Sequence, residues 1–261
     1  MNNIAKIRGT LDSLTVPIAV ETKYDGELEY IHIEHDNVYL VNKYGRVRRD
    51  MPVTDELTDQ LKDKNMILCG ELFMNDGKDF YTDFINDKFN RDMNLAIFDI
   101  VSLDNQDMRY TPYYKRRKIL ESIQIRKHYF VTGCEIADSR DEVRAYADET
   151  IHNGYEGIVA KSIQGNLLNA YCQAKIKRVL SYDLLTGNGV LGRNSIALID
   201  GDNKEVGNVS LIGHNDVRTG QIVEVECTGV TPTIKLRNPR IKRVRHDKNL
   251  PDRVERSSYG K

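Results

Sequence analysis

The sequence has few cysteines, and their spacing favours neither cross-linking nor metal binding. They are scattered along the chain and form no C-x-x-C pair. This pattern argues against a disulfide framework and against a four-thiolate zinc site. We therefore expect reduced thiols at all four positions, Cys69, Cys134, Cys172 and Cys227.

Long apolar runs and a leader sequence are lacking as well. No run approaches the roughly 18 apolar residues that a membrane-spanning helix needs. The first residues do not combine a basic start, an apolar stretch and a small-residue cleavage site, as a secretory signal does. These absences predict a cytoplasmic protein that has no membrane partner.

An excess of one charge is absent overall but present at one end. The chain has 38 Lys and Arg residues against 39 Asp and Glu residues. Residues 235–261, however, contain ten basic and three acidic side chains. Such an asymmetry predicts a polyanion as the partner of the C-terminal end.

Residues 1–179 alternate strand-like and helix-like stretches. The apolar patterns of residues 27–35 and 37–42 predict a β-hairpin. A capping box that starts at Ser139 begins a helix, and an Asn-Gly pair ends it at Gly154. This region therefore combines strands with helices.

Residues 180–261 have a different character, with short strands separated by turns that contain glycine. A length of about 80 residues and this strand pattern predict a small five-stranded barrel. No Ser/Pro-rich linker separates the two regions. We therefore expect a short hinge between Arg178 and Tyr182.

One candidate for chemistry is Lys23, within Lys23-Tyr-Asp-Gly26 at the end of a short apolar strand. Taken alone, such a tetrad is typical of an ion pair at a β-turn with a turn glycine. The alternative is a lysine nucleophile. A lysine near its free pKa is a poor nucleophile and needs neighbouring cations or desolvation to lose its proton.

Further segments carry other candidate side chains. Glu156 begins a buried-looking strand, and Lys175 and Lys177 alternate, which places both on one face of a strand. Glu71 lies in an apolar strand, and Phe98 lies in a core-like strand. Each of these residues alone is typical of a surface charge or of core packing.

The order of these motifs is the discriminating feature. It resembles the order in the covalent nucleotidyltransferase superfamily, which contains ATP-dependent ligases and capping enzymes. The C-terminal segment, with its Arg245-x-Asp247-Lys248 spacing, is similar to the closing motif of ATP-dependent DNA ligases. The resemblance covers almost the whole chain and rests on Lys23-x-Asp-Gly, Gly70-Glu71-Leu, Phe98-Asp, Glu156-Gly-Ile-Val-x-Lys161 and Lys175-x-Lys177.

The resemblance implies an α+β fold in two domains. Residues 1–179 would form a nucleotidyltransferase (adenylation) domain with antiparallel sheets and flanking helices. Residues 180–261 would form an all-β OB-fold domain. Because Lys23 lies near the start of the sequence, we expect a minimal, monomeric ligase without an N-terminal DNA-binding domain.

The implied reaction is the ATP-dependent sealing of nicks in duplex DNA, between a 3′-OH and a 5′-phosphate. By the resemblance, Lys23 would attack the α-phosphorus of ATP and form lysyl-AMP, from which AMP passes to the DNA. Lys175 and Lys177 would neutralise the α-phosphate and help to keep Lys23 unprotonated.

The resemblance also implies binding roles. Glu21 and Phe98 would hold adenine, and Glu71 would contact the ribose. The divalent metal, Mg²⁺ or Mn²⁺, would bind through Glu156, Glu71 and Asp25. The residues that orient the leaving pyrophosphate would be Arg245, Asp247 and Lys248. The expected contacts to nicked DNA are Lys43, Arg46, Arg48, Arg49, Arg240 and Arg243.

The sequence departs from the ligase pattern at several positions. Leu28 stands where DNA ligases usually have an arginine, and Lys43-Tyr44 stands where the family tends to Arg-Asn. Gln173 replaces the usual tryptophan before the Lys-x-Lys pair. These changes bear on substrate contacts more than on nucleotidyl transfer.

Other classes of function stay open. An RNA ligase or an mRNA guanylyltransferase would share Lys23-Tyr-Asp-Gly26 and Glu156-Gly157, and the Arg245-x-Asp-Lys ending favours DNA joining over both. A non-catalytic OB-fold nucleic-acid-binding protein is a further alternative. Pure binding would not require a lysine and two carboxylates in this arrangement, which favours an enzyme.

Overall fold

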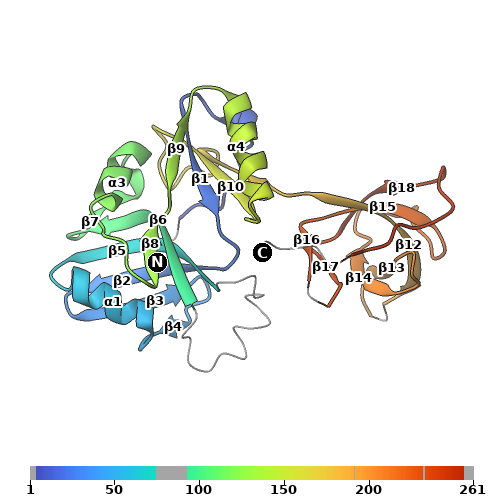
Figure 1. The fold of residues 1–261 in the computed structure, drawn as a ribbon, viewed down its shortest axis with the longest axis horizontal. Coiled ribbons are helices and arrows are strands. Elements are labelled where there is room, and N and C mark those ends of the chain that lie inside the picture. Colours follow the sequence, from blue (N-terminus) through green and yellow to red (C-terminus); the bar gives the residue numbers. More distant parts are fainter. Residues whose placement is uncertain (1–3, 75–92, 191, 232, 256–261) are drawn as a thin grey trace. The chain divides into compact units, whose positions relative to one another are not determined.

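The chain divides into two compact units, residues 1–177 (unit 1) and residues 178–261 (unit 2) (Figure 1). The sequence predicted a boundary between residues 179 and 180. The computed structural model describes residues 4–74, 93–190, 192–231 and 233–255. Each unit has its own apolar core.

Unit 1 contains a four-stranded antiparallel sheet that carries most of the candidate site. It is built from β1 (Ile18–Lys23), β9 (Cys134–Ala137), β10 (Gly157–Ser162) and β11 (Gln173–Lys177), with α4 (Arg140–His152) against it. The strand order is β11-β10-β1-β9. Because side chains alternate along a strand, Val20 and Ile158 lie on one face, where they pack in a cluster with Val143 of α4.

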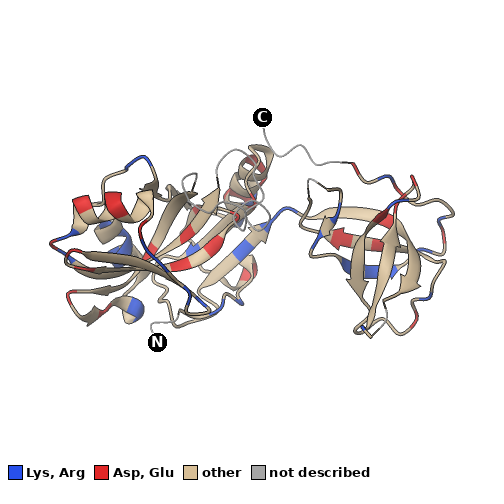
Figure 2. Ribbon diagram, turned by 90° about the horizontal axis from the view of Figure 1, so that it is seen from below, with Lys and Arg blue, Asp and Glu red and all other residues tan. Residues whose placement is uncertain are grey.

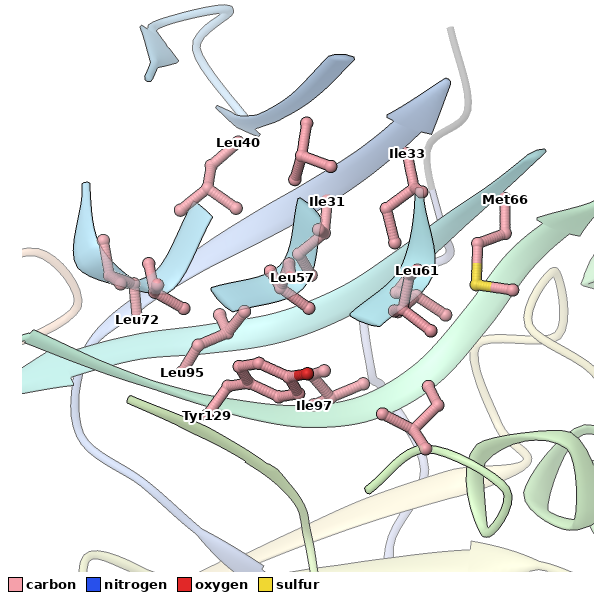
Figure 3. Packing of buried hydrophobic residues seen from close by; sticks show 14 of the residues in the cluster. Ile31, Ile33, Leu40, Leu57, Leu61, Met66, Leu72, Leu95, Ile97 and Tyr129 are labelled. Carbon is pink, nitrogen blue, oxygen red and sulfur yellow. The ribbon is translucent and has the colours of Figure 1, made fainter. Parts of the chain in front are cut away.

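The second sheet of unit 1 is larger and has the order β4-β3-β2-β5-β6-β7, with β8 parallel to β6. Its strands are β2 (Glu27–Glu34), β3 (Asn37–Asn42), β4 (Val47–Arg48), β5 (Asn65–Met74), β6 (Met93–Leu103), β7 (Gln106–Asp107) and β8 (Tyr129–Val131). Helix α1 (Pro52–Leu61) packs on this sheet, and Figure 3 shows its Leu57 and Leu61 among Ile31 and Leu95 of the core.

Local signals in the sequence predicted several of these elements. Ser139 caps α4 by accepting a 3.2 Å hydrogen bond from the backbone N–H of Glu142, and the helix ends at His152, as predicted. The predicted hairpin is confirmed, since Tyr30 of β2 lies opposite Val41 of β3. No described helix is long and apolar enough to cross a membrane. The other helical segments are η1 (Leu11–Ser13), η2 (Met108–Tyr110) and α3 (Tyr113–Leu120).

Unit 2 contains β12 (Leu180–Gly189), β13 (Ser195–Ile199), β14 (Glu205–Ser210), β15 (Ile222–Cys227), β16 (Gly229–Val230), β17 (Leu236–Arg237) and β18 (Arg240–Val244). The five longer strands form an antiparallel sheet in the order β14-β13-β12-β15-β18. Leu184, Val223 and Ile241 belong to its apolar core. Five antiparallel strands around one core are typical of an OB-fold barrel.

Candidate active site

Three strands of the smaller sheet bring Lys23, Glu156 and Lys177 together. Lys23 of β1 lies opposite Gly157 of β10, and Gly157 lies opposite Lys177 of β11. Residues directly opposite each other in antiparallel strands share a face of the sheet. Lys23 and Lys177 therefore lie on one face, and Glu156 directly precedes β10, the strand between them.

Glu156 joins the two lysines. One of its carboxylate oxygens pairs with Lys23 Nζ and the other with Lys177 Nζ. Lys23 Nζ also donates a 3.2 Å hydrogen bond to the carbonyl oxygen of Tyr24. Burial raises the pKa of the Glu156 carboxyl, but the two cations outweigh burial, and the net shift of this pKa is downward.

The charge state of Lys23 differs from the expectation. Burial lowers the pKa of Lys23, but nearby carboxylates, above all Glu156, raise it above its ordinary value of 10.5. Lys23 is therefore an ammonium ion beside Glu156, and Lys175 and Lys177 do not keep it unprotonated in this arrangement. The pKa that falls is that of Lys175, through burial and the neighbouring ammonium groups.

Gly26 allows the turn after Lys23 to pack against the larger sheet. A Cβ atom on Gly26 would lie 2.1 Å from the carbonyl oxygen of Leu72 on β5, so packing requires glycine here. The backbone N–H of Gly26 donates a 3.2 Å hydrogen bond to Glu71 Oε1. Burial raises the pKa of the Glu71 carboxyl to about 7, although Lys23 acts in the opposite direction.

Glu21 lies in a buried ionic network on the same face of β1 as Lys23. Lys161 Nζ lies 2.7 Å from Glu21 Oε2, and the Tyr113 hydroxyl donates a hydrogen bond to Glu21 Oε1. Lys161 Nζ also donates a 3.0 Å hydrogen bond to the carbonyl oxygen of Phe98 and lies 5.3 Å from the centroid of its ring. Both expected adenine contacts therefore share one buried cation.

Lys161 and Tyr113 were not among the candidates that the sequence suggested. A signal for Lys161 was present in the sequence, because this residue closes the Glu-Gly-Ile-Val-x-Lys motif. It also lies four positions after Gly157 on β10, and therefore on the same face of the strand. Tyr113 had none: it lies on α3, 92 positions from Glu21, and only packing brings the two side chains together.

Aromatic rings surround the turn after Lys23, and they were not identified from the sequence as part of the candidate site. The centroid of the Tyr24 ring lies 4.8 Å from that of Phe73, 5.4 Å from that of Phe130 and 5.5 Å from that of Tyr155. Phe73 belongs to the larger sheet, whereas Tyr24 directly follows Lys23. The ring cluster therefore links the two sheets beside the lysine.

The carboxylates near Lys23 suit a hard divalent cation. Glu71 and Glu156 both act electrostatically on Lys23, as does the exposed Asp25. Mg²⁺ is usually held by one or two carboxylates together with substrate phosphates. In the part of the chain that the structure describes, no three His, Cys, Asp or Glu side chains are grouped to hold a metal by themselves. These side chains therefore fit a metal that a bound nucleotide helps to hold.

The model of the family described as "ATP dependent DNA ligase domain" matches residues 2–177. The chain belongs to this family. A probable DNA ligase of Dictyoglomus turgidum is 30% identical over 161 residues, which cover 56% of this chain and 28% of that protein. For two further curated ligases the covered shares are 27% and 30%, so this chain spans less than a third of the length of these relatives.

Solved structures of other ligase family members match nearly the whole chain. The ligase domain of LigD from M. tuberculosis is 21% identical, with a TM-score of 0.57 over 95% of this chain and 96% of that one. A Lig E DNA ligase is 14% identical, with a TM-score of 0.71 over 93% of this chain and 99% of that one. At these identities the likeness concerns the fold, and it confirms the predicted nucleotidyltransferase and OB-fold class.

Among the arginines that the family resemblance assigned to DNA, Arg48 does not fit. It is 6% exposed and pairs with Glu27 at 2.6 Å and with Glu29. This burial contradicts a phosphate contact, and Arg48 instead pairs with two acidic side chains inside unit 1. The other residues assigned to DNA are exposed: Lys43, Arg46, Arg49, Arg240 and Arg243. Figure 2 colours the Lys and Arg positions of both units blue.

The closing-motif residues of this ligase family member gather around Asp183 in unit 2. Arg245 Nη1 donates to both Asp183 oxygens, at 2.9 and 2.8 Å, and Lys248 Nζ lies 2.6 Å from Asp183 Oδ2. Asp247 accepts from Nε and Nη2 of Arg245 at 2.8 and 2.7 Å. These hydrogen bonds raise the pKa of Arg245 and lower the pKa of Asp247.

Proposed function

We propose that the protein is an ATP-dependent DNA ligase that seals nicks between a 3′-OH and a 5′-phosphate in duplex DNA. The observation that carries the proposal is the cluster of Lys23, Glu156 and Lys177, which sets an amine beside a carboxylate and a second cation. Membership of the ATP-dependent DNA ligase domain family supports ATP and DNA as the substrates.

In the first step the neutral amine of Lys23 attacks the α-phosphorus of ATP. A phosphorus–nitrogen bond forms, the bond from this phosphorus to the bridging oxygen breaks, and pyrophosphate leaves with the bonding electrons. Because Lys23 is an ammonium ion beside Glu156, it must first lose a proton. Positive charge from Lys175 and Lys177 favours this loss and stabilises the phosphoryl oxygens.

The later steps transfer AMP to the DNA and then join the strands. An oxygen of the 5′-phosphate attacks the phosphorus of lysyl-AMP, and the Lys23 amine leaves and takes up a proton. The 3′-hydroxyl then loses its proton as it attacks the activated 5′-phosphate, and AMP leaves. All steps are displacements at phosphorus, for which positioning and charge stabilisation supply most of the catalysis.

In this proposal Glu21 and Phe98 hold the adenine, and Glu71 contacts the ribose. The hydrogen bond and ion pair that Lys161 makes with Phe98 and Glu21 support the adenine assignment. A carboxylate held in place by a buried cation can accept a hydrogen bond from the exocyclic amino group of adenine. The ring of Phe98 would stack on the base.

The remaining parts of the proposal concern the metal and the DNA. Mg²⁺ or Mn²⁺, bound through Glu156, Glu71 and Asp25, would supply charge neutralisation at the phosphates. We further propose that the protein acts as a monomer in the cytoplasm. Pyrophosphate would be oriented by Arg245, Asp247 and Lys248. Nicked DNA would be bound by Lys43, Arg46, Arg49, Arg240 and Arg243.

The proposal is tested with α-labelled ATP and Mg²⁺, followed by singly nicked duplex DNA. We expect label on the wild-type protein, none on Lys23→Ala, and normal label on the control Lys204→Ala, whose side chain is exposed in unit 2. Label on Lys23→Ala would overturn the nucleophile. Labelled protein that joins nicked RNA but not nicked DNA would favour the RNA ligase alternative.

A further inference from the structure

Asp183 is the point at which the closing-motif cations meet. It lies on β12 and is 5% exposed. Its Oδ2 atom accepts from Arg245 Nη1 at 2.8 Å and lies 2.6 Å from Lys248 Nζ. Two cations that converge on one oxygen atom lie side by side, and the carboxylate between them offsets their mutual repulsion. Neither the sequence motifs nor the family resemblance pointed to this aspartate.

The backbone around Asp183 holds the same segment of chain. Its N–H donates a 2.7 Å hydrogen bond to Asp252 Oδ2, and its carbonyl oxygen accepts a 2.7 Å hydrogen bond from the N–H of Asp252. The N–H of Arg245 donates to the carbonyl oxygen of Ile222 at 2.7 Å. Both ends of the stretch from Arg245 to Asp252 are therefore tied to the sheet of unit 2.

The Arg245 guanidinium is fixed in orientation as well as in place. Asp247 accepts hydrogen bonds from Nε and Nη2 of Arg245, and Asp183 accepts from Nη1. An arginine fork held by two carboxylates loses its rotamer freedom before any ligand arrives. Charges that are oriented before the reaction act on a transition state without further reorganisation.

We propose that Asp183 is a positioning residue, which holds Arg245 and Lys248 as a preformed cationic pair for the leaving pyrophosphate. This inference rests on the proposed function, because it takes from that proposal the role of Arg245 and Lys248. It adds a residue of β12 that touches neither nucleotide nor DNA and acts only through the two cations.

A different role for the same contacts makes an opposite prediction. If the Asp183 carboxylate only masked the two cations, its removal would free them and make pyrophosphate binding tighter. If it positions them, its removal leaves two like charges unsupported, and pyrophosphate binding becomes weaker. The direction of the change therefore separates positioning from masking.

The experiment compares Asp183→Asn with Glu226→Gln, a matched control that removes a carboxylate charge from β15 in the same sheet, where Glu226 pairs with Lys242 at 3.2 Å. The first assay reverses self-adenylylation by adding pyrophosphate to the adenylylated protein. For Asp183→Asn we expect at least about a tenfold rise in half-saturating pyrophosphate and a similar loss in self-adenylylation. We expect the control to match the wild type. A lower half-saturating pyrophosphate concentration for Asp183→Asn than for the wild type would overturn the proposal.

A second assay, the sealing of pre-adenylylated nicks, does not involve pyrophosphate. We expect Asp183→Asn to retain this activity, so an equal loss in both assays would contradict a positioning role and indicate a general loss of structure. The double variant Arg245→Ala with Lys248→Ala supplies a further readout. If Asp183 acts only through the two cations, adding Asp183→Asn to this double variant changes self-adenylylation little, whereas an independent role of Asp183 would add a further loss.

The same set separates the two proposals. Normal self-adenylylation by Arg245→Ala and by Lys248→Ala would refute the pyrophosphate role in the proposed function, and Asp183 would then have nothing to position. A loss in these variants with normal behaviour of Asp183→Asn would refute only the inference about Asp183.

Discussion

Lys23 and Glu156 form an ion pair although 133 positions separate them along the chain. The pair results from the register of β1 and β10, in which Lys23 lies opposite Gly157. Gly157 has φ +145°, and a Cβ atom there would lie 2.1 Å from the carbonyl oxygen of Ile176, so glycine alone allows β11 to approach this closely. The packing of three strands therefore sets the charge state of Lys23.

Replacing Glu156 with Gln should make Lys23 more reactive toward an amine-specific acylating reagent in the absence of ATP and metal. The Glu156 carboxylate raises the pKa of Lys23, so its neutralisation lowers this pKa and increases the fraction of free amine at a given pH. Mass spectrometry after brief acylation at about pH 9 measures the modification of Lys23.

The control for this prediction is Glu149→Gln, which neutralises an exposed carboxylate on α4. It should leave the acylation of Lys23 unchanged. The same Glu156→Gln variant should lose nick sealing, because the proposed metal ligand is gone. Unchanged or slower acylation of Lys23 in Glu156→Gln would show that the ion pair does not control its protonation.

Replacing Lys161 with Met should destabilise the protein and weaken ATP binding. The Glu21 carboxylate would lose its buried partner, and removing one member of a buried pair typically costs about 3–5 kcal/mol. We expect the double variant Glu21→Gln with Lys161→Met to regain part of the lost stability but none of the lost ATP affinity. Denaturant unfolding and the KM for ATP in self-adenylylation measure the two effects.

This prediction has a clear contrary outcome. If Lys161 only filled space, the double variant would be no more stable than Lys161→Met alone. The KM for ATP would then follow the stability of the fold. Sealing of pre-adenylylated nicks serves as the internal control, since that reaction does not require the binding of ATP.

Arg48 and Arg49 are adjacent but should respond differently to substitution by Ala. Arg48 pairs with Glu27 and Glu29 inside unit 1, so its loss should cost about 3–5 kcal/mol of unfolding free energy and leave the salt dependence of DNA binding unchanged. Arg49 is exposed. Its loss should reduce the log-log salt slope of nick binding by about 0.9 with little change in stability.

The two measurements are denaturant unfolding and nick affinity between about 50 and 200 mM salt. A smaller salt slope in Arg48→Ala together with an unchanged slope in Arg49→Ala would reverse the assignment. An unchanged slope in both variants would remove Arg49 from the proposed DNA contacts.

Replacing Glu29 with Gln should flatten the pH dependence of stability. Glu29 is fully buried, and burial raises the pKa of its carboxyl to about 8, although Arg48 acts in the opposite direction. The folded state keeps this proton up to about pH 8, whereas the unfolded state releases it near the ordinary value of 4.5. The wild type therefore loses stability as the pH rises through this window.

Denaturant unfolding at about pH 6 and pH 9 tests this sign. The free energy of unfolding of Glu29→Gln, compared with that of the wild type, should be higher at about pH 9 than at about pH 6. The control Glu226→Gln, at a more exposed ion pair in unit 2, should show no such trend. If the wild type instead gains stability relative to Glu29→Gln as the pH rises, the effect of Arg48 on the pKa of Glu29 outweighs that of burial.

The sequence by itself determined the elements whose causes are local and the family whose motifs are ordered along the chain. The capping box at Ser139 and the hairpin of residues 27–42 depend on hydrogen bonds and alternation within a few residues. The order of Lys23-x-Asp-Gly, Glu156-Gly and Lys175-x-Lys177 along the chain resembled that of ATP-dependent DNA ligases, and the family model that matches residues 2–177 confirms this resemblance.

Only the tertiary structure decided which charges are buried and with what they pair. Arg48 and Arg49 are adjacent and identical in type, but one is buried between carboxylates and the other is exposed. Asp183 contacts Arg245, 62 positions further along the chain, because the chain folds back onto β12. Burial and Coulombic attraction depend on the distances between atoms in the folded protein. Separation along the chain does not reveal those distances.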